Sequence, residues 1–223
     1  MSDLPQQGLY RVSERLEVAP YIPTSATSAL DVGCGSGGFG RTLRRALGPS
    51  ARIVGVDPVE SNVASSAEGN GFDEVLHGYF PNAFEGRRDT FDLIVFNDVL
   101  EHVVDPWALL REVPRQLAPG GKVLAAIPNI AFLPIILQLL RGRWDYTDEG
   151  TLDRTHVRFF TLATAREMFE QEGYDVEVCV GANSLADSRR VLRPFRPLLR
   201  GLQFLHVVIV ATPRNRPGSA ATT

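Results

Sequence analysis

The stretch Ala29-Leu-Asp-Val-Gly-Cys-Gly-Ser-Gly-Gly-Phe-Gly40 decides the fold of this 223-residue chain. Its first residues predict a short buried strand that ends at Asp31 and Val32, and its last residues predict a helix that starts near Phe39. Between them, glycine stands at positions 33, 35, 37 and 38, and again at 40. A turn with so few side chains lets a ligand approach the backbone, and glycine tolerates the positive φ angles of such a turn.

Two classes of ligand fit this turn. Gly33, Gly35 and Gly38 match the dinucleotide pattern G-x-G-x-x-G, and Asp57 follows at the distance expected for a ribose contact. Asp31 favours the other class, because a carboxylate beside the turn would repel a pyrophosphate held at the helix N-terminus. S-adenosylmethionine (SAM) has no phosphate and carries an ammonium and a sulfonium. The sequence therefore predicts SAM rather than NAD.

The same residues resemble class I SAM-dependent methyltransferases. The run Leu30-Asp-Val-Gly-Cys-Gly-Ser-Gly37 is similar to the first motif of that family, and Leu117-Ala-Pro-Gly-Gly-Lys-Val-Leu124 is similar to a later block. The resemblance covers about residues 25–212. It implies an α/β fold of the Rossmann-like, doubly wound kind, with a mostly parallel seven-stranded sheet and an antiparallel last strand. We expect one domain over residues 1–212 and a disordered tail over 213–223.

The resemblance also implies a set of SAM-binding residues. Asp57 would accept hydrogen bonds from the ribose hydroxyls, although a helix cap before Pro58 is the alternative. Asn97 and Asp98 follow a strand predicted at 91–96 and would lie near the methionine end of SAM. Many relatives read the adenine with an acid after the third strand, and this chain has none in His77-Gly-Tyr-Phe80. The full expected set is Asp31, Gly33, Cys34, Gly35, Gly37, Asp57, Pro58, Asn97 and Asp98.

A long insertion after the fifth strand, at about residues 129–160, predicts a lid, since insertions of this length are usually functional. Its tract Gly150-Thr-Leu-Asp-Arg-Thr-His-Val-Arg-Phe-Phe-Thr161 resembles a block of bacterial methyltransferases of the ubiquinone-biosynthesis type, and of relatives in glycan and secondary-metabolite pathways. Apolar residues and two aromatic residues before that tract suggest a partly apolar or ring-bearing acceptor. The residues expected to contact the acceptor are Trp144, Tyr146, Arg158 and Tyr10. For Tyr10, a packing role is the alternative, and for Arg158, an ion pair with Asp153 is the alternative.

The expected reaction is an SN2 methyl transfer to a hydroxyl of a small molecule, either a sugar in a glycan precursor or a phenol-like metabolite. A hydroxyl acceptor must lose a proton, and histidine is the usual acceptor near neutral pH. His156 is the first candidate, with Asp153 to orient it, and His102 is the second. Packing roles are the alternative for both histidines. N-methylation of a small amine and SAM binding without turnover are the other functions that the sequence leaves open.

Composition narrows the partners. The net charge of −3 gives no general attraction to nucleic acid. Two cysteines, Cys34 and Cys179, predict neither a disulfide nor a metal site, so we expect a reducing cytoplasm. The acids and histidines are not spaced as a ligand set, which predicts transfer without a metal. No apolar run is long enough to span a membrane. Arginines at 189–200 predict at most weak membrane-surface contact, and a homodimer is a further expectation.

Several elements are expected from local signals. The first three strands are expected at about 28–32, 52–57 and 74–77, and the first helix of the repeat at about 38–47. Apolar residues at helical spacing predict an N-terminal helix over residues 10–21. Asp105 and Pro106 predict a helix start, and Pro119-Gly-Gly121 predicts its end, before a strand over 122–127. Thr161 or Thr164 is expected to cap a later helix, and Thr164 and Glu167 fit a capping box. The last two strands are expected at 174–180 and 205–211.

Overall fold

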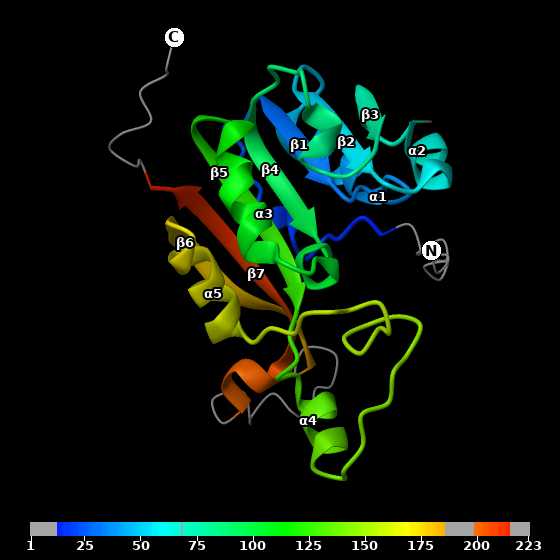
Figure 1. The fold of residues 1–223 in the computed structure, drawn as a ribbon, viewed down its shortest axis with the longest axis vertical. Coiled ribbons are helices and arrows are strands. Elements are labelled where there is room, and N and C mark those ends of the chain that lie inside the picture. Colours follow the sequence, from blue (N-terminus) through cyan, green and yellow to red (C-terminus); the bar gives the residue numbers. More distant parts are fainter. Residues whose placement is uncertain (1–12, 68, 186–198, 215–223) are drawn as a thin grey trace.

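The computed structural model describes residues 13–67, 69–185 and 199–214. Its centre is a seven-stranded sheet in the order β3-β2-β1-β4-β5-β7-β6, drawn in Figure 1. The strands are β1 (Ser28–Val32), β2 (Arg52–Asp57), β3 (Glu74–His77), β4 (Phe91–Asn97), β5 (Leu117–Pro128), β6 (Tyr174–Ser184) and β7 (Phe204–Pro213). Neighbours from β3 to β5 are parallel, whereas β7 runs antiparallel to both β5 and β6. The expected fold class is confirmed.

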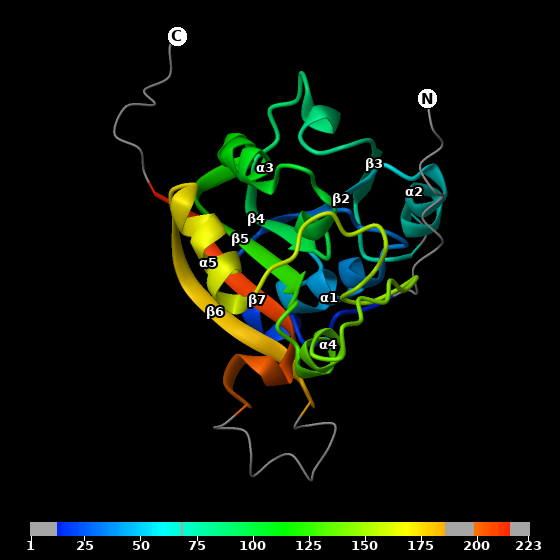
Figure 2. The same cartoon turned by 60° about the horizontal axis from the view of Figure 1, so that its bottom comes forward.

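Helices cover both faces of the sheet. The α-helices are α1 (Gly38–Leu47), α2 (Glu60–Ala67), α3 (Pro106–Glu112), α4 (Leu133–Leu139) and α5 (Leu162–Gln171), and the 3-10 helices are Ala19–Tyr21, Asn82–Phe84, Leu100–His102, Val113–Arg115 and Arg200–Gln203. One hydrophobic cluster packs α3 and α5 against the sheet, and a second packs α1 against it. Figure 2 shows α1 and α3 on opposite sides of the strands. This layering leaves the carboxyl edge of the parallel strands open for a ligand.

Strands β1, β2 and β3 have the predicted bounds. In β1 and β2, Leu30, Ile53 and Val54 are fully buried, because both faces of a central parallel strand are covered by helices. Helix α1 also has its predicted bounds, and the αL conformation of Gly37 forms its N-cap. The glycine-rich turn therefore lies between β1 and α1.

The predicted N-terminal helix is wrong for the residues that can be compared. Residues 13–21 form a turn and the 3-10 helix Ala19–Tyr21, and Pro20 stands inside that short helix. Helix α3 is shorter than expected, because Pro114 starts a separate 3-10 turn at Val113–Arg115. β5 begins at Leu117 instead of 122, and its first pair joins Leu117 to Phe91 before a register shift. The spacing of apolar residues predicted longer helices than the structure has, because it does not account for Pro20 and Pro114.

Later elements need smaller corrections. Thr161, one of the two expected caps, is the N-cap of α5, and the capping box joins Thr161 to Thr164 rather than Thr164 to Glu167. β6 and β7 both extend beyond their predicted ends, because they pair with each other along most of their length. Pro213 belongs to β7, so the predicted tail is wrong for that residue. Residues 215–223 lie outside the described residues.

The expected insertion after β5 is present. Ile130 N donates to Phe160 O at 2.8 Å, and a bridge joins Asn129 to Phe160, so the insertion leaves and rejoins the sheet at one place. Helix α4 and the loop after it project beyond the body of the molecule at the lower end of Figure 1. No residue of α4 is buried. Within the described ranges, no helix is long and apolar enough to cross a bilayer.

One buried hydroxyl offers a test of the packing between α3 and β6. Tyr174 is 1% exposed, and its hydroxyl donates to Leu110 O at 2.6 Å. Tyr174→Phe leaves that buried carbonyl without its side-chain donor, so we expect the free energy of unfolding to fall by about 1–2 kcal/mol. Urea unfolding followed by circular dichroism measures this. Tyr79→Phe, at an exposed tyrosine, is the control and should change stability by less than about 0.5 kcal/mol.

Candidate functional site

The glycine-rich turn has the backbone geometry that the sequence predicts. Gly33, Gly35 and Gly37 have φ angles of 68°, 53° and 87°, in the left-handed region that favours glycine. Gly38 is required for a different reason. A Cβ at Gly38 would lie 2.3 Å from the backbone oxygen of Ser13, so the segment before β1 packs directly on the N-terminus of α1.

Two carboxylates stand at the strand ends beneath this turn. Asp31 is 2% exposed and Asp57 is 4% exposed. Burial, together with the smaller effect of the neighbouring charge of Asp57, raises the pKa of Asp31 to about 8. A buried acid of this kind is stabilised in its charged form by a cation. The site therefore favours a positively charged ligand, as the sequence argument requires.

Asp57 also holds the turn in place. Its Oδ2 accepts from Gly35 N at 2.8 Å, and its Oδ1 accepts from Val59 N at 2.9 Å and from Asn62 Nδ2 at 3.1 Å. The bonds from Val59 and Asn62 are those expected if Asp57 caps α2, which was the alternative role for this residue. The ribose contact stays a prediction. Pro58 contributes its carbonyl, which lies 3.0 Å from His77 Nε2.

The side chain of Cys34 points beneath the turn rather than toward open space. Its Sγ lies 4.0 Å from Ser66 Oγ, and a Cβ at Gly55 of β2 would lie 2.9 Å from the same sulfur. Burial raises the pKa of the thiol well above its usual range. Any contact of Cys34 with a ligand would therefore come from its backbone.

At the end of β4, the two other predicted donor-site residues differ in their surroundings. The Oδ1 and Nδ2 atoms of Asn97 are both buried without a hydrogen-bond partner, which marks a side chain that a ligand would satisfy. Asp98 has a positive φ of 53°. Its carboxylate pairs with the guanidinium of Arg15, and His206 Nε2 lies 3.6 Å from its Oδ1.

The adenine end of the site has no acid, as the sequence indicates. Phe80 is 8% exposed and packs edge-on against Phe84 and Phe96 at 6.0 Å between ring centroids. That ring is part of the core and is not available to stack on a base. Tyr79 is 68% exposed, so it is the aromatic residue of this loop that could reach a ligand.

The two predicted bases lie side by side. The rings of His102 and His156 are 4.7 Å apart between centroids. His156 Nδ1 lies 3.1 Å from Thr151 O, a carbonyl that can only accept. His102 Nδ1 lies 3.1 Å from Thr155 Oγ1, whose hydrogen is donated to Asp153 Oδ1 at 2.7 Å. Both Nδ1 atoms therefore carry the hydrogen, and both Nε2 atoms keep a lone pair when the rings are neutral.

This arrangement changes the role expected for Asp153. The sequence placed it beside His156 to orient that ring. In the structure its carboxylate reaches His102 through the hydroxyl of Thr155. Burial, together with the nearby His156, lowers the pKa of His102. A neutral His102 can accept a proton near neutral pH.

Glu101 completes this cluster. It is 1% exposed, and neither of its carboxylate oxygens has a hydrogen-bond partner. Its Oε1 lies 3.9 Å from His156 Nε2. Burial, with the nearby Asp98 acting in the same direction, raises the pKa of Glu101 well above its usual range.

The same cluster could hold a metal ion. One ligand atom each from Glu101, His102 and His156 lie within 4.8 Å of one another. The prediction of metal-independent transfer rested on the absence of a ligand set in the spacing of acids and histidines. Residues 101 and 156 are far apart in sequence, so spacing could not show this cluster. Metal-independent transfer thus stays a prediction that needs a direct test.

The lid brings aromatic rings next to His156. Trp144 contacts Phe159 at 5.2 Å and Tyr146 at 6.2 Å between ring centroids, and Phe159 lies 6.3 Å from His156. Trp144 and Tyr146 are 37% and 54% exposed. The two predicted acceptor residues thus lie together, with Phe159 as a third ring that the sequence argument missed.

Arg158 and Tyr10 are not placed with them. The guanidinium of Arg158 donates to Val104 O and lies 5.9 Å over the ring of Trp107. These contacts hold the end of the lid against the loop between β4 and α3. They differ from both predicted contacts of Arg158, which were the acceptor and Asp153. Tyr10 lies outside the described residues.

Three further residues of this region were not in the predicted set. Glu101 had a local signal, since it stands beside His102 in the stretch after β4. Arg15 and His206 had none, because they come from the segment before β1 and from β7 and meet Asp98 only through the fold. A basic residue in an N-terminal segment or a histidine in a late strand has no pattern that would identify it.

Comparison with known proteins identifies the family of this chain. A family model described as a methyltransferase domain matches residues 6–178. The human mitochondrial ubiquinone biosynthesis O-methyltransferase is 30% identical over 171 residues, which are 73% of this chain and 45% of that protein. The chain therefore spans about half the length of that relative.

Solved structures show the same fold. A SAM-dependent methyltransferase from Archaeoglobus fulgidus superposes with a TM-score of 0.63 at 20% identity, over 89% of this chain and 94% of that one. An O-methyltransferase from neocarzinostatin biosynthesis, solved with SAM and 2-hydroxy-5-methyl naphthoic acid, gives a TM-score of 0.58 at 19% identity, over 88% and 51%. The chain belongs to the methyltransferase domain family and has the class I fold of SAM-dependent methyltransferases.

Proposed function

We propose that this chain transfers a methyl group from SAM to a hydroxyl on a ring-bearing small molecule. The observation that carries the proposal is the histidine pair. His156 is buried and His102 is partly buried, and their rings contact each other. Both Nδ1 atoms are engaged as donors, and both Nε2 atoms can take a proton. This pair lies beside the ring cluster of Trp144, Tyr146 and Phe159.

The donor site fits SAM on three features of the chain itself. The bare turn at Gly33–Gly38 leaves room for a nucleoside, Asp31 favours a cation, and the side chain of Asn97 has polar atoms that a ligand would satisfy. When bound, SAM supplies a methyl group on a positively charged sulfur. Asp98 and Arg15 present one negative and one positive charge at the mouth of this site, which suits an amino-acid end with both charges.

The acceptor side would act by position and by proton removal. Alignment of the acceptor oxygen with the methyl carbon is a positioning task, which we assign to the aromatic side chains of the lid. The proton that the acceptor hydroxyl loses during methyl transfer would pass to Nε2 of one of the two histidines, His102 or His156. Asp153 would stabilise the charged His102 through Thr155.

A phenol-like acceptor is favoured over a sugar. The lid presents three aromatic rings in contact with one another, and Phe159 is the ring next to His156. Aromatic rings pack well on other rings. The name of the human relative places its O-methylation in ubiquinone biosynthesis, and the neocarzinostatin enzyme was solved with a hydroxylated naphthoic acid. These similarities support the same acceptor class here.

A methyl-transfer screen tests the proposal. Purified protein is incubated with SAM and panels of phenols and catechols, sugars and small amines, and methylated products are detected by mass spectrometry. We expect O-methylated phenols or catechols. Transfer to amines would support N-methylation, and SAM binding with no product in any panel would support a non-catalytic SAM-binding protein.

Metal removal separates two roles for the buried cluster. If the histidines accept the proton directly, dialysis against EDTA should leave the rate of methyl transfer unchanged. Loss of activity that Mg²⁺ or Zn²⁺ restores would instead assign Glu101, His102 and His156 to a metal ion. Binding of S-adenosylhomocysteine before and after dialysis is the control, because the donor site lies at the glycine-rich turn.

The remaining partner expectations belong to this proposal. We expect a small-molecule acceptor, no nucleic acid, a cytoplasmic location and, in solution, a homodimer. The arginine-rich segment predicted to touch a membrane surface falls mostly at 186–198, outside the described residues.

A further inference from the structure

Backbone strain gathers around one carboxylate. Among the described residues other than glycine, four have positive φ angles: Arg15 at 45°, Asp98 at 53°, Asn183 at 55° and Arg200 at 40°. Such conformations cost on the order of 1–3 kcal/mol each and persist where the surroundings fix them. Three of the four belong to one side-chain network, which includes Asp98 and extends to β6 and β7.

The network can be followed atom by atom. The guanidinium of Arg15 pairs with Asp98, His206 Nε2 lies 3.6 Å from Asp98 Oδ1, and Asn183 Nδ2 lies 3.3 Å from His206 Nδ1. The amide nitrogen of Asn183 can only donate, so His206 Nδ1 accepts. The hydrogen of the neutral ring is then on Nε2, directed toward Asp98.

This network lies at the ligand edge of the sheet. Asp98 directly follows β4, and His206 on β7 pairs with Pro128, the last residue of β5. Arg15 is anchored from the other side, because Glu14 pairs with Arg41 and Arg45 of α1. The carboxylate of Asp98 is thus held between the N-terminal segment and the two last strands.

His206 adds a directional contact without adding charge. Its side chain is 12% exposed, and burial lowers its pKa, so the ring is neutral near pH 7. Asp98 and Arg15 carry opposite charges, and Arg15 Nε also pairs with Glu17 Oε1 at 2.9 Å. A ligand with a carboxylate and an ammonium can exchange with the pair of Asp98 and Arg15. When a ligand replaces the ion pair between Arg15 and Asp98, the contact between His206 and Asp98 remains. The orientation of the Asp98 carboxylate then depends on His206.

We propose that His206 and Asn183 are positioning residues for Asp98, and that they set the affinity of this site for the amino-acid end of the methyl donor. The inference rests on the function proposed above. It assigns a role to β6 and β7 in donor binding, although both strands lie on the far side of β5 from the glycine-rich turn.

Binding of S-adenosylhomocysteine, measured by calorimetry, tests this directly. His206→Phe keeps a ring and removes the donor, so we expect the Kd to rise about threefold to tenfold. His206→Gln keeps an N–H donor and should restore most of the affinity. In an Asp98→Asn background, His206→Phe should have no further effect. In turnover, His206→Phe should raise KM for SAM and leave kcat nearly unchanged.

A pair of glycine variants separates positioning from stability. Asn183→Gly removes the side-chain amide, and glycine tolerates the positive φ angle of this position. Arg200→Gly also places glycine at a positive φ angle, but Arg200 is not part of the network around Asp98. Both should be at least as stable as the wild type in urea, and only Asn183→Gly should weaken binding of S-adenosylhomocysteine. This pair also reports on the proposal if His206→Phe fails to fold.

Three results would overturn the inference: an unchanged Kd in His206→Phe and Asn183→Gly, additive effects of His206→Phe and Asp98→Asn, or equal weakening by Asn183→Gly and Arg200→Gly. Failure of the underlying function has a different signature, since the wild-type protein itself would then show no binding of S-adenosylhomocysteine.

Discussion

Replacing Asp31 by asparagine is expected to weaken the binding of SAM by at least about tenfold and, at pH 8, to stabilise the protein without ligand. The two effects have one cause. Asp31 is 2% exposed beside Asp57, and its pKa is raised to about 8. A buried carboxylate is costly until a cation joins it. Asparagine carries no charge, so it removes both the free-energy cost of the buried carboxylate and the electrostatic attraction for the positively charged ligand.

The sign of the pH dependence follows from the shift. The pKa of Asp31 lies near 8 in the folded protein and near 3.8 in the unfolded chain, where the carboxyl is exposed to water. The folded state therefore holds a proton that the unfolded chain releases, and this contribution to stability is lost as the pH rises from about 4 to about 8. Near pH 4 the variant and the wild type should differ little through this group, and near pH 8 the variant should be more stable by about 1–3 kcal/mol.

Urea unfolding at the two pH values and calorimetric titration with SAM measure both halves of this prediction. Asp92→Asn is the matched control, because Asp92 lies at the opposite end of the parallel strands and accepts bonds from Thr27 and Ser28. That variant should lose stability and keep its affinity for SAM. Loss of stability at pH 8 in Asp31→Asn, with unchanged affinity, would contradict the role given to Asp31.

Substitution of the histidine pair should have the largest effect on turnover. We expect His102→Ala and His156→Ala each to lower kcat by about 10²-fold or more, the range of general-base contributions. Because the two rings contact each other and serve the same proton transfer, the kcat of the double variant should be only slightly below that of the less active single variant. The Kd for S-adenosylhomocysteine should stay within about threefold of the wild type.

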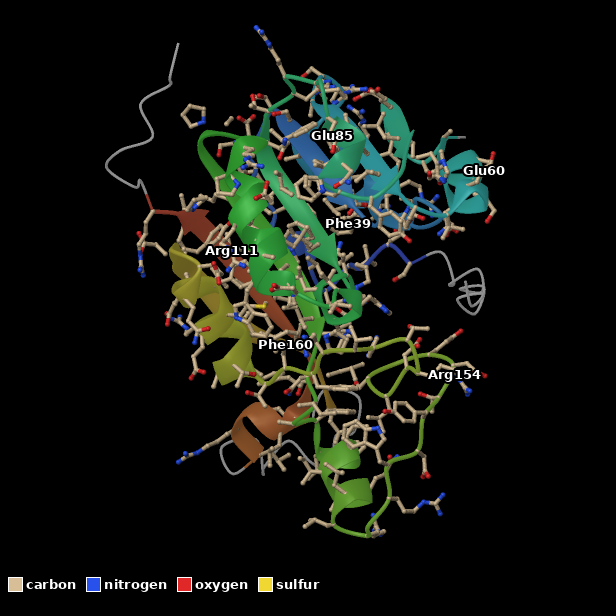
Figure 3. All side chains as sticks on the ribbon, in the orientation of Figure 1. Phe39, Glu60, Glu85, Arg111, Arg154 and Phe160 are labelled. Atoms are coloured by element: carbon tan, nitrogen blue, oxygen red, sulfur yellow. The ribbon has the colours of Figure 1, made fainter. Side chains whose placement is uncertain are left out.

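Single-turnover methyl transfer and calorimetry on the same preparations give the two readouts. Arg154→Ala is the control from the same tract, since Arg154 is exposed and pairs with Asp148 on the lid. Figure 3 labels this residue on the lid loop. Wild-type turnover in both histidine variants would remove proton acceptance from the proposal, whereas parallel loss of donor binding would give the pair a structural role.

The donor half of the site could be predicted from sequence because its parts are local. Asp31 and the glycines lie in one run, and the turn between a buried strand and a helix fixes their geometry within a few residues. Asp57 ends the next strand, and parallel neighbours end at the same edge of a sheet. The positions of Asp31, Asp57 and the glycines in the fold therefore follow from their positions in the sequence.

The other half could not be predicted in the same way. His102 and His156 meet because the lid returns to the sheet, and the bond between Thr155 and His102 spans 53 residues. Their tautomers depend on that contact and on the carbonyl of Thr151. The network of Arg15, Asp98 and His206 joins three segments that share no pattern. Sequence named both histidines as candidates, but their partners follow only from the fold.

Calorimetry of the wild-type protein at pH 7, in two buffers with different enthalpies of ionisation, tests the central electrostatic claim. Because Asp31 is mostly protonated at that pH without ligand, binding of SAM should release nearly one proton, and Asp31→Asn should release none. NAD should give no heat of binding. Binding of NAD in preference to SAM, or binding of SAM without proton release, would contradict the account.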